Sequence, residues 1–155
     1  MSLRDAIGYT ALVALVAVGV AAFVSLPATI PTSFGFDGRP QGWGPKVTIL
    51  LLPASGVVAF AIATIAQATR PRATLPFRVP DGRQAAAQAA LYAGTGDLKA
   101  FLTCGFVALT LVQVASSRGN LSPAFFPVLA TFVIVLLGIV TGMFVRAWRA
   151  AYPVA

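Results

Sequence analysis

The 155-residue chain lacks histidine altogether and has one cysteine, four acidic residues and eleven basic residues. Without histidine, it has neither the usual general base nor the commonest metal ligand. A single cysteine cannot form a disulfide within the chain or supply a cysteine pair for zinc. Charged residues make up only 10% of the sequence, whereas soluble domains contain about 25%. These absences argue against a soluble enzyme, and we expect no catalytic residues, no metal and no cofactor.

Hydrophobic residues make up 58% of the sequence, and many of them lie in four long runs that contain no charge. A helix needs about 20 mostly apolar residues to cross a bilayer core of about 30 Å. The runs are 18 to 25 residues long and cover 6–26, 47–69, 100–117 and 121–145. A charge at the centre of a span costs roughly 2.5–3.5 kcal/mol on insertion scales, so a bilayer would enforce this separation.

We therefore predict an all-α integral membrane bundle of four transmembrane helices. It forms a single domain over 1–155, with spans at about 6–26, 47–69, 98–117 and 121–145. A soluble bundle would need a polar stripe on each helix, and a membrane β-barrel would need alternating polar positions. Neither pattern is present in these runs. No ionisable residue is expected inside the spans, which argues against an ion-coupled transporter.

The basic residues predict the orientation of the bundle. Eight of the eleven lie near the two termini and in the connection 70–99, and three lie in the loop 27–46 and the turn before the last span. The positive-inside rule then places both termini in the cytoplasm of a bacterial cell, with the loop 27–46 outside the plasma membrane. Because the basic residues are spread over helix ends, we expect them to contact lipid headgroups and not nucleic acid.

Small residues mark two possible helix-packing faces. Ser55, Ala59 and Ala63 recur every four residues in the second span, and Gly138 and Gly142 form a GxxxG pair in the fourth. Such residues let helix backbones approach closely in a membrane. The contact is expected within the chain, with a second copy, or with another membrane protein.

Three further features concern local structure. Pro53 predicts a kink around residues 49–53, because its ring crowds the carbonyl four residues earlier. Gln113 is the one bulky polar side chain of the third span, and an interhelical hydrogen bond would explain it. In the connection 70–97, the proline-rich first part cannot be regular helix. The alanine-rich stretch 84–92 is either a short surface helix or the start of the third span.

The loop 27–46 is long for a connection between two membrane helices and is rich in turn-forming and aromatic residues. One interpretation is a structured cap that seals the bundle. The other is a surface that recognises a membrane protein or an extracellular peptide. The candidate residues for either role are Phe34, Phe36, Asp37, Arg39, Trp43 and Lys46.

The loop also resembles a known family. Its Ile30-Pro31-x-x-Phe34, Asp37-Gly38-x-Pro40 and Trp43-Gly44-Pro45-Lys46 segments are similar to the signature of SdpI-like bacterial membrane proteins, over roughly residues 20–65. The resemblance implies a small, multi-pass, non-enzymatic protein, in a family where some members act in toxin immunity and signalling. Members commonly have histidine where this chain has Ser33, so a metal or proton role at that position is not carried over.

The sequence thus predicts a non-catalytic membrane protein that serves as an accessory or stabilising subunit of a larger complex or homo-oligomer. The alternative is an SdpI-like immunity or signalling protein that uses the outer loop as its receptor surface. The expected partners are membrane lipid and other membrane protein subunits or a second copy of the chain.

Overall fold

The computed structural model describes residues 3–35, 40–70, 73–118 and 125–153. The chain is mostly helical, at 77%. The elements in chain order are α1 (Leu3–Ser25), β1 (Thr29–Phe34), β2 (Pro40–Pro45), the 3-10 helix η1 (Lys46–Leu50), α2 (Leu51–Thr69), α3 (Gln84–Tyr92), α4 (Thr95–Ser117) and α5 (Phe125–Ala151). Within these described residues, four helical segments are long and apolar enough to cross a membrane.

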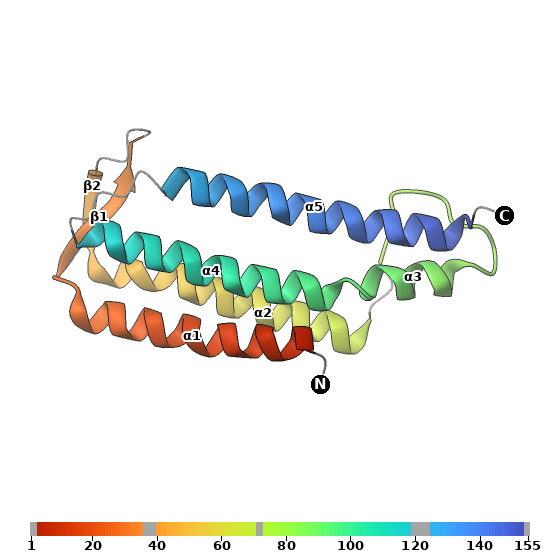
Figure 1. The fold of residues 1–155 in the computed structure, drawn as a ribbon, viewed down its shortest axis with the longest axis horizontal. Helices are drawn as coiled ribbons and strands as arrows, with labels where there is room; N and C mark the ends of the chain where they lie inside the picture. Colours follow the sequence, from red (N-terminus) through yellow and green to blue (C-terminus); the bar gives the residue numbers. More distant parts are fainter. Residues whose placement is uncertain (1–2, 36–39, 71–72, 119–124, 154–155) are drawn as a thin grey trace.

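The four long helices run side by side in alternating directions, as Figure 1 shows. Helix α4 packs against α1, α2 and α5, and α3 packs against α5. The two strands lie at one end of the bundle, which we call the hairpin end. Helix α3, the start of α1 and the end of α5 lie toward the opposite end, which we call the α3 end.

The second span begins with a change of helix type. The 3-10 helix η1 leads directly into α2, and Pro53 is the third residue of α2. The irregularity expected around 49–53 thus takes the form of a 3-10 turn before the proline. Pro53 is buried, and its ring lies over Gly19 of α1, where an added Cβ would be 3.0 Å from the proline Cγ. The proline therefore forms part of the contact between α1 and α2.

One face of α2 is buried, and its members are spaced three to four residues apart: Pro53, Gly56, Phe60 and Ala63. At Gly56, an added Cβ would lie 2.5 Å from Leu15 of α1 and 2.9 Å from Phe106 of α4. This glycine lets three helices meet. Of the predicted stripe, Ala63 belongs to this face, Ala59 is half-buried and Ser55 is exposed. The Ser55 hydroxyl donates to the Leu51 carbonyl of its own helix at 2.7 Å.

The loop 27–46 contains β structure, which corrects the all-α prediction. Strands β1 and β2 form an antiparallel hairpin in which Ile30 pairs with Gly44. The Ile30 side chain is fully buried in a cluster at the hairpin end, together with Ala22, Leu26, Ile49 and Val114. The hairpin is therefore anchored to the bundle by apolar contacts with α1, η1 and α4.

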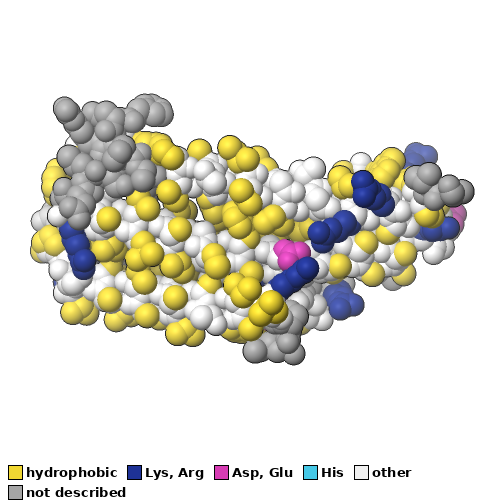
Figure 2. All heavy atoms as spheres, in the orientation of Figure 1, with side chains coloured by type: hydrophobic (Ala, Val, Ile, Leu, Met, Phe, Trp, Pro, Cys, Tyr) yellow, Lys and Arg dark blue, Asp and Glu magenta, His cyan; other side chains and the backbone are white. Residues whose placement is uncertain are grey.

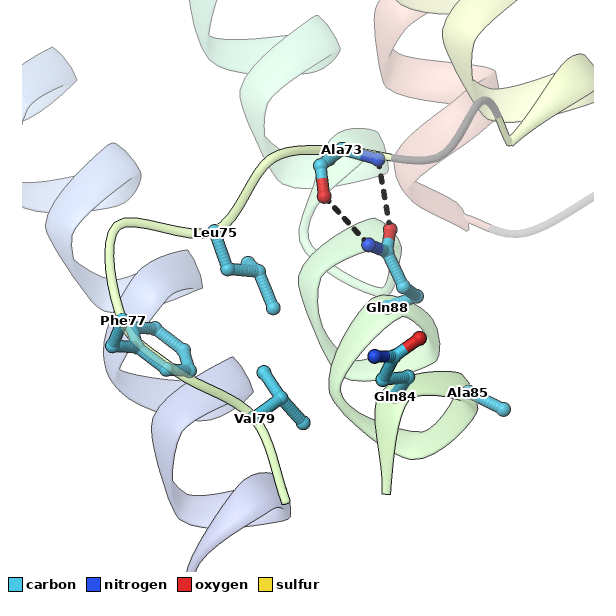
Figure 3. A pocket seen from close by; sticks show the side chains of 7 residues that line it. All are labelled: Ala73, Leu75, Phe77, Val79, Gln84, Ala85 and Gln88. Atoms are coloured by element: carbon cyan, nitrogen blue, oxygen red, sulfur yellow. Dashed lines mark hydrogen bonds between the residues drawn. The ribbon is translucent and has the colours of Figure 1, made fainter. Parts of the chain in front are cut away.

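The connection before α3 runs as an extended segment over residues 73–80, with side chains alternately half-buried and exposed. The Gln88 side chain of α3 accepts from the Ala73 amide at 3.1 Å and donates to the Ala73 carbonyl at 2.7 Å. Figure 3 shows this pair and, beside it, Leu75 and Val79 directed toward α3 across a cavity of about 550 Å³. Phe77 packs edge-on against Trp148 of α5, with ring centroids 5.1 Å apart.

Helix α3 continues into α4 through a short turn at residues 93–94, so the alanine-rich stretch leads into the third span. At the α3 end, Leu91, Met143 and Ala147 form a small apolar core that Leu75 and Phe77 cover. The extended segment, α3 and the end of α5 thus form one packed unit.

The lateral surface of the bundle is apolar. Large hydrophobic side chains are strongly exposed on several helices, for example Val13 at 70%, Ile62 at 62% and Ile134 at 68%. Figure 2 shows hydrophobic side chains over most of one face, with basic side chains gathered toward the two ends. Water would not favour this distribution, whereas lipid tails would cover it. The protein is an integral, multi-pass membrane protein.

Candidate functional site

The hairpin places the predicted loop residues in different surroundings. Trp43 lies in β2 and is 66% exposed. Lys46 begins η1, and its Nζ lies 4.7 Å from the centroid of the Phe23 ring of α1. Phe34 is the last residue of β1, whereas Phe36, Asp37 and Arg39 lie outside the described residues. Trp43 and Lys46 therefore do not converge on one point: the tryptophan is at the surface and the lysine is held against α1.

The glycines of the loop have a packing role. An added Cβ at Gly44 would lie 2.7 Å from the Thr32 Cγ2 atom, and one at Gly42 would lie 2.5 Å from the Ser33 Oγ atom. Such distances are far shorter than ordinary contacts. The two glycines thus let β2 lie close against the Thr32 and Ser33 side chains of β1.

A cavity of about 470 Å³ lies at the hairpin end, and its lining comes from five elements. It is lined by Thr32 and Ser33 of β1, Thr48 of η1, Leu51 and Leu52 of α2, Gln113 of α4 and Phe126 of α5. Three hydroxyl groups and one amide thus meet apolar side chains in a molecule that is otherwise mostly apolar. Sequence inspection does not find this group, because its members are up to 94 residues apart.

The amide of Gln113 distinguishes this cavity. Its Oε1 atom is buried and has no hydrogen-bond partner among the described residues, so the interhelical hydrogen bond expected for Gln113 is not made through this atom. Other polar groups of the bundle bond to their own helix: the Thr110 hydroxyl donates to the Phe106 carbonyl at 2.7 Å. A buried acceptor without a partner costs about 1–3 kcal/mol. The cavity is therefore lined by a residue whose buried acceptor has no partner among the described residues.

A second polar cluster lies toward the α3 end, between α1, α2 and α4. Lys99 is only 2% exposed, and its Nζ donates to the Asp5 carboxylate at 2.8 Å and to the Gln67 amide oxygen at 3.0 Å. The same Nζ lies 5.2 Å from the Tyr9 ring centroid and 5.3 Å from that of Phe60. These contacts satisfy an ammonium group without a ligand, so the cluster joins three helices.

The Lys99 cluster lies at the ends of two predicted spans. Asp5 and Lys99 lie in the first turns of α1 and α4, next to the charge-free runs. The two helices extend past these charges, and the two side chains pair with one another. The signal missed in the sequence is the opposite sign of two charges at adjoining helix ends.

The glycine pair of α5 makes no helix contact within the described structure. An added Cβ at Gly138 or Gly142 would meet nothing within 4 Å. At Gly105 of α4, by contrast, an added Cβ would overlap with the Phe132 ring of α5. The close approach of α4 and α5 thus depends on Gly105, and the predicted role of Gly138 and Gly142 in packing against another chain stays a prediction.

Comparison with known proteins identifies one segment of the chain. Residues 10–57 match the protein family described as "Domain of unknown function (DUF1648)", a family of multi-pass membrane proteins. The match covers most of α1, the hairpin, η1 and the start of α2, and it confirms the resemblance inferred from the loop. It includes the cavity residues Thr32, Ser33 and Thr48, but not Gln113. Searches of curated proteins and of solved structures found no match to the chain.

Proposed function

We propose that this membrane protein is a non-catalytic accessory subunit that binds a membrane protein partner at its hairpin end. The observation that supports the proposal is the buried Gln113 Oε1 atom, which has no hydrogen-bond partner among the described residues. A partner that inserts a hydrogen-bond donor into the cavity would remove the cost of this unpaired acceptor. The hydroxyl groups of Thr32 and Ser33 line the same cavity and would contribute polar contacts.

The exposed apolar faces of the bundle are weaker candidates for the partner site than the cavity at the hairpin end. In a bilayer, an exposed valine or isoleucine is already solvated by lipid tails and needs no protein partner. A buried amide oxygen gains no hydrogen bond from a lipid tail. The Gln113 Oε1 atom, which has no partner among the described residues, therefore favours the hairpin end over the small-residue faces as the place where a partner binds.

The proposal includes an orientation. The hairpin end faces outward from a bacterial plasma membrane, and the α3 end with both termini faces the cytoplasm. The basic side chains support this, because most of them belong to the termini and to the connection before α4. The partner therefore contacts the subunit in or near the outer half of the bilayer.

The test is affinity purification in a mild detergent, followed by mass spectrometry, with matched variants. Gln113→Leu replaces the amide by an apolar side chain of similar size, and Gln41→Leu makes the same change at an exposed position of β2. We expect Gln113→Leu to lower recovery of the partner roughly tenfold, because one hydrogen bond to a buried acceptor is lost. Gln41→Leu should leave recovery unchanged. Equal recovery with both variants, or a wild-type chain that purifies as a lone monomer, would overturn the proposal.

A second candidate function is an immunity or signalling receptor, and the exposure of Trp43 favours it. A tryptophan that is 66% exposed on a hairpin is a typical anchor for a peptide or protein ligand. If this function holds, Trp43→Ala or Asp37→Ala should abolish protection or signalling while the amount of protein in the membrane stays the same. Loss of either variant from the membrane would instead indicate a structural role for the loop.

A further inference from the structure

A groove lies between α4 and α5 toward the α3 end, away from the hairpin cavity. Its volume is about 420 Å³. Its apolar part is formed by α5 residues: Val135, Gly138, Ile139, Gly142 and Met143. Because an added Cβ at either glycine would meet nothing within 4 Å, the groove is open along this side of α5. The stretch from Val135 to Arg146 covers about 16 Å of helix. The groove is therefore long, narrow and apolar, a shape that suits an alkyl chain.

The end of the groove nearest the termini is charged. Asp97 of α4 and Arg146 of α5 line it, and their side chains are 3.8 Å apart. Arg4 of α1 pairs with the same carboxylate at 2.9 Å. Both arginine side chains stay more than half exposed, at 57% for Arg4 and 58% for Arg146. Two guanidinium groups thus share one carboxylate, which leaves a net positive charge where the apolar groove ends.

On the face drawn in Figure 2, several basic side chains and one acidic group lie close together, with hydrophobic side chains around them. Lipid headgroups gather where basic side chains border an apolar surface. The 3.8 Å separation between Arg146 and Asp97 is longer than a hydrogen bond. The N–H groups of Arg146 are therefore well placed to bind a second anion. A guanidinium binds phosphate through two parallel hydrogen bonds.

We propose that this groove is a binding site for one anionic phospholipid. One acyl chain lies along Gly138 and Gly142, and the phosphate binds Arg146 and Arg4. The charge of the chain argues against a second copy as the occupant. The protein carries a net charge of +7 with only four acidic residues, so another copy has little negative charge to offer this basic end. A phospholipid supplies both the alkyl chain and the negative charge.

Native mass spectrometry of the full chain in a neutral detergent tests the proposal. The probes are phosphatidylglycerol, phosphatidylcholine with the same acyl chains, and glycerol 3-phosphate, which has the phosphate without the chains. We expect phosphatidylglycerol to bind about tenfold more tightly than either of the others, because charge-assisted hydrogen bonds and chain burial act together. Arg146→Gln should remove the preference over phosphatidylcholine. Gly142→Leu should weaken binding of both lipids by filling the groove.

The matched control is Arg83→Gln, which removes the same charge at the N-terminal end of α3 and should leave the preference intact. If Arg146→Gln does not fold, Arg4→Gln removes the second guanidinium of the same site. Equal binding of the two lipids, or equal effects of Arg146→Gln and Arg83→Gln, would overturn the site. Glycerol 3-phosphate binding as tightly as the lipid would indicate an anion site only. A dimer that Gly142→Leu converts to a monomer would show that a second copy occupies the groove.

Discussion

At the residue scale, one glycine of the bundle is closely packed and another lies in open space. Alanine at the first should lower the stability of the protein, whereas alanine at the second should raise it. At Gly56, a Cβ would lie 2.5 Å from Leu15, so Gly56→Ala forces the helices apart and should cost about 2 kcal/mol. At Gly138 the space is open, so Gly138→Ala should stabilise α5 by about 0.5–1 kcal/mol through its better helix propensity. Thermal unfolding in detergent measures both. Equal shifts of the melting temperature would contradict the packing described for Gly56.

Substitution of Lys99 should lower the stability of the bundle, because this residue of α4 contacts both α1 and α2. The Lys99 side chain is only 2% exposed. Lys99→Met removes the ammonium group that donates to both the Asp5 carboxylate and the Gln67 amide oxygen. We expect a loss of about 3 kcal/mol, because the ion pair with Asp5 and the hydrogen bond to Gln67 are both lost from a buried site. The control Arg83→Met changes an exposed residue and should have little effect.

The double variant Asp5→Asn/Lys99→Met separates pairing from packing. If the cost of Lys99→Met comes from the lost ion pair with Asp5, the double variant should recover part of the stability. Additive losses in the unfolding measurement would mean that the methylene groups of Lys99 carry the effect. In that case the Tyr9 and Phe60 rings, which lie near the lysine, would be its important neighbours.

At the scale of elements, we expect the buried Ile30 side chain to hold the hairpin against the end of the helix bundle. Ile30 is 0% exposed, whereas Trp43 on the other strand is 66% exposed. Ile30→Ala should therefore cost about 3 kcal/mol and release the hairpin, whereas Trp43→Ala should change stability by less than about 0.5 kcal/mol. Hydrogen exchange of the amides in β1 and β2 is the measurement. Faster exchange in Trp43→Ala than in Ile30→Ala would contradict this anchoring.

The spans could be predicted from the sequence because a bilayer separates apolar from charged residues so strongly. The third span was expected at about 98–117 and α4 covers Thr95–Ser117; the fourth was expected at about 121–145 and α5 covers Phe125–Ala151. The hairpin could not be predicted in this way. Pro31, Gly42 and Gly44 interrupt the alternation of β-branched residues that marks most strands. Its pairing depends on glycines that accept the Thr32 and Ser33 side chains.

The candidate site illustrates a different limit of sequence analysis. That Gln113 is unusual in an apolar helix can be read from the sequence alone. Whether its amide finds a partner depends on which way α4 faces and on what the hairpin brings near it, and neither is a local property. The Oε1 atom of Gln113 has no hydrogen-bond partner among the described residues, and the Thr48 hydroxyl, which lines the same cavity, donates to the Pro45 carbonyl at 2.9 Å.

The whole molecule has two chemically different ends. The hairpin end combines hydroxyl groups, an unpaired amide oxygen and an exposed tryptophan. The α3 end combines the Lys99 cluster with arginines at the ends of α1 and α5. Neutral hydrogen-bonding groups favour a protein or peptide ligand, whereas guanidinium groups at the edge of an apolar zone favour phosphate. The two proposed sites thus differ in ligand because they differ in charge, and each can be lost without the other.

The orientation of the whole molecule can be tested with single cysteines placed at its two ends. Cys104 is free and exposed on α4, so the background variant is Cys104→Ser. Trp43→Cys then reports on the hairpin end, and Thr74→Cys reports on the extended segment beside α3; both positions are exposed. Because basic residues are retained on the cytoplasmic side, a membrane-impermeant maleimide added to intact cells should label the cysteine at 43 and not the one at 74. Permeabilised cells should be labelled at both positions. The reverse pattern would place the proposed partner site in the cytoplasm and move the phospholipid site to the outer leaflet.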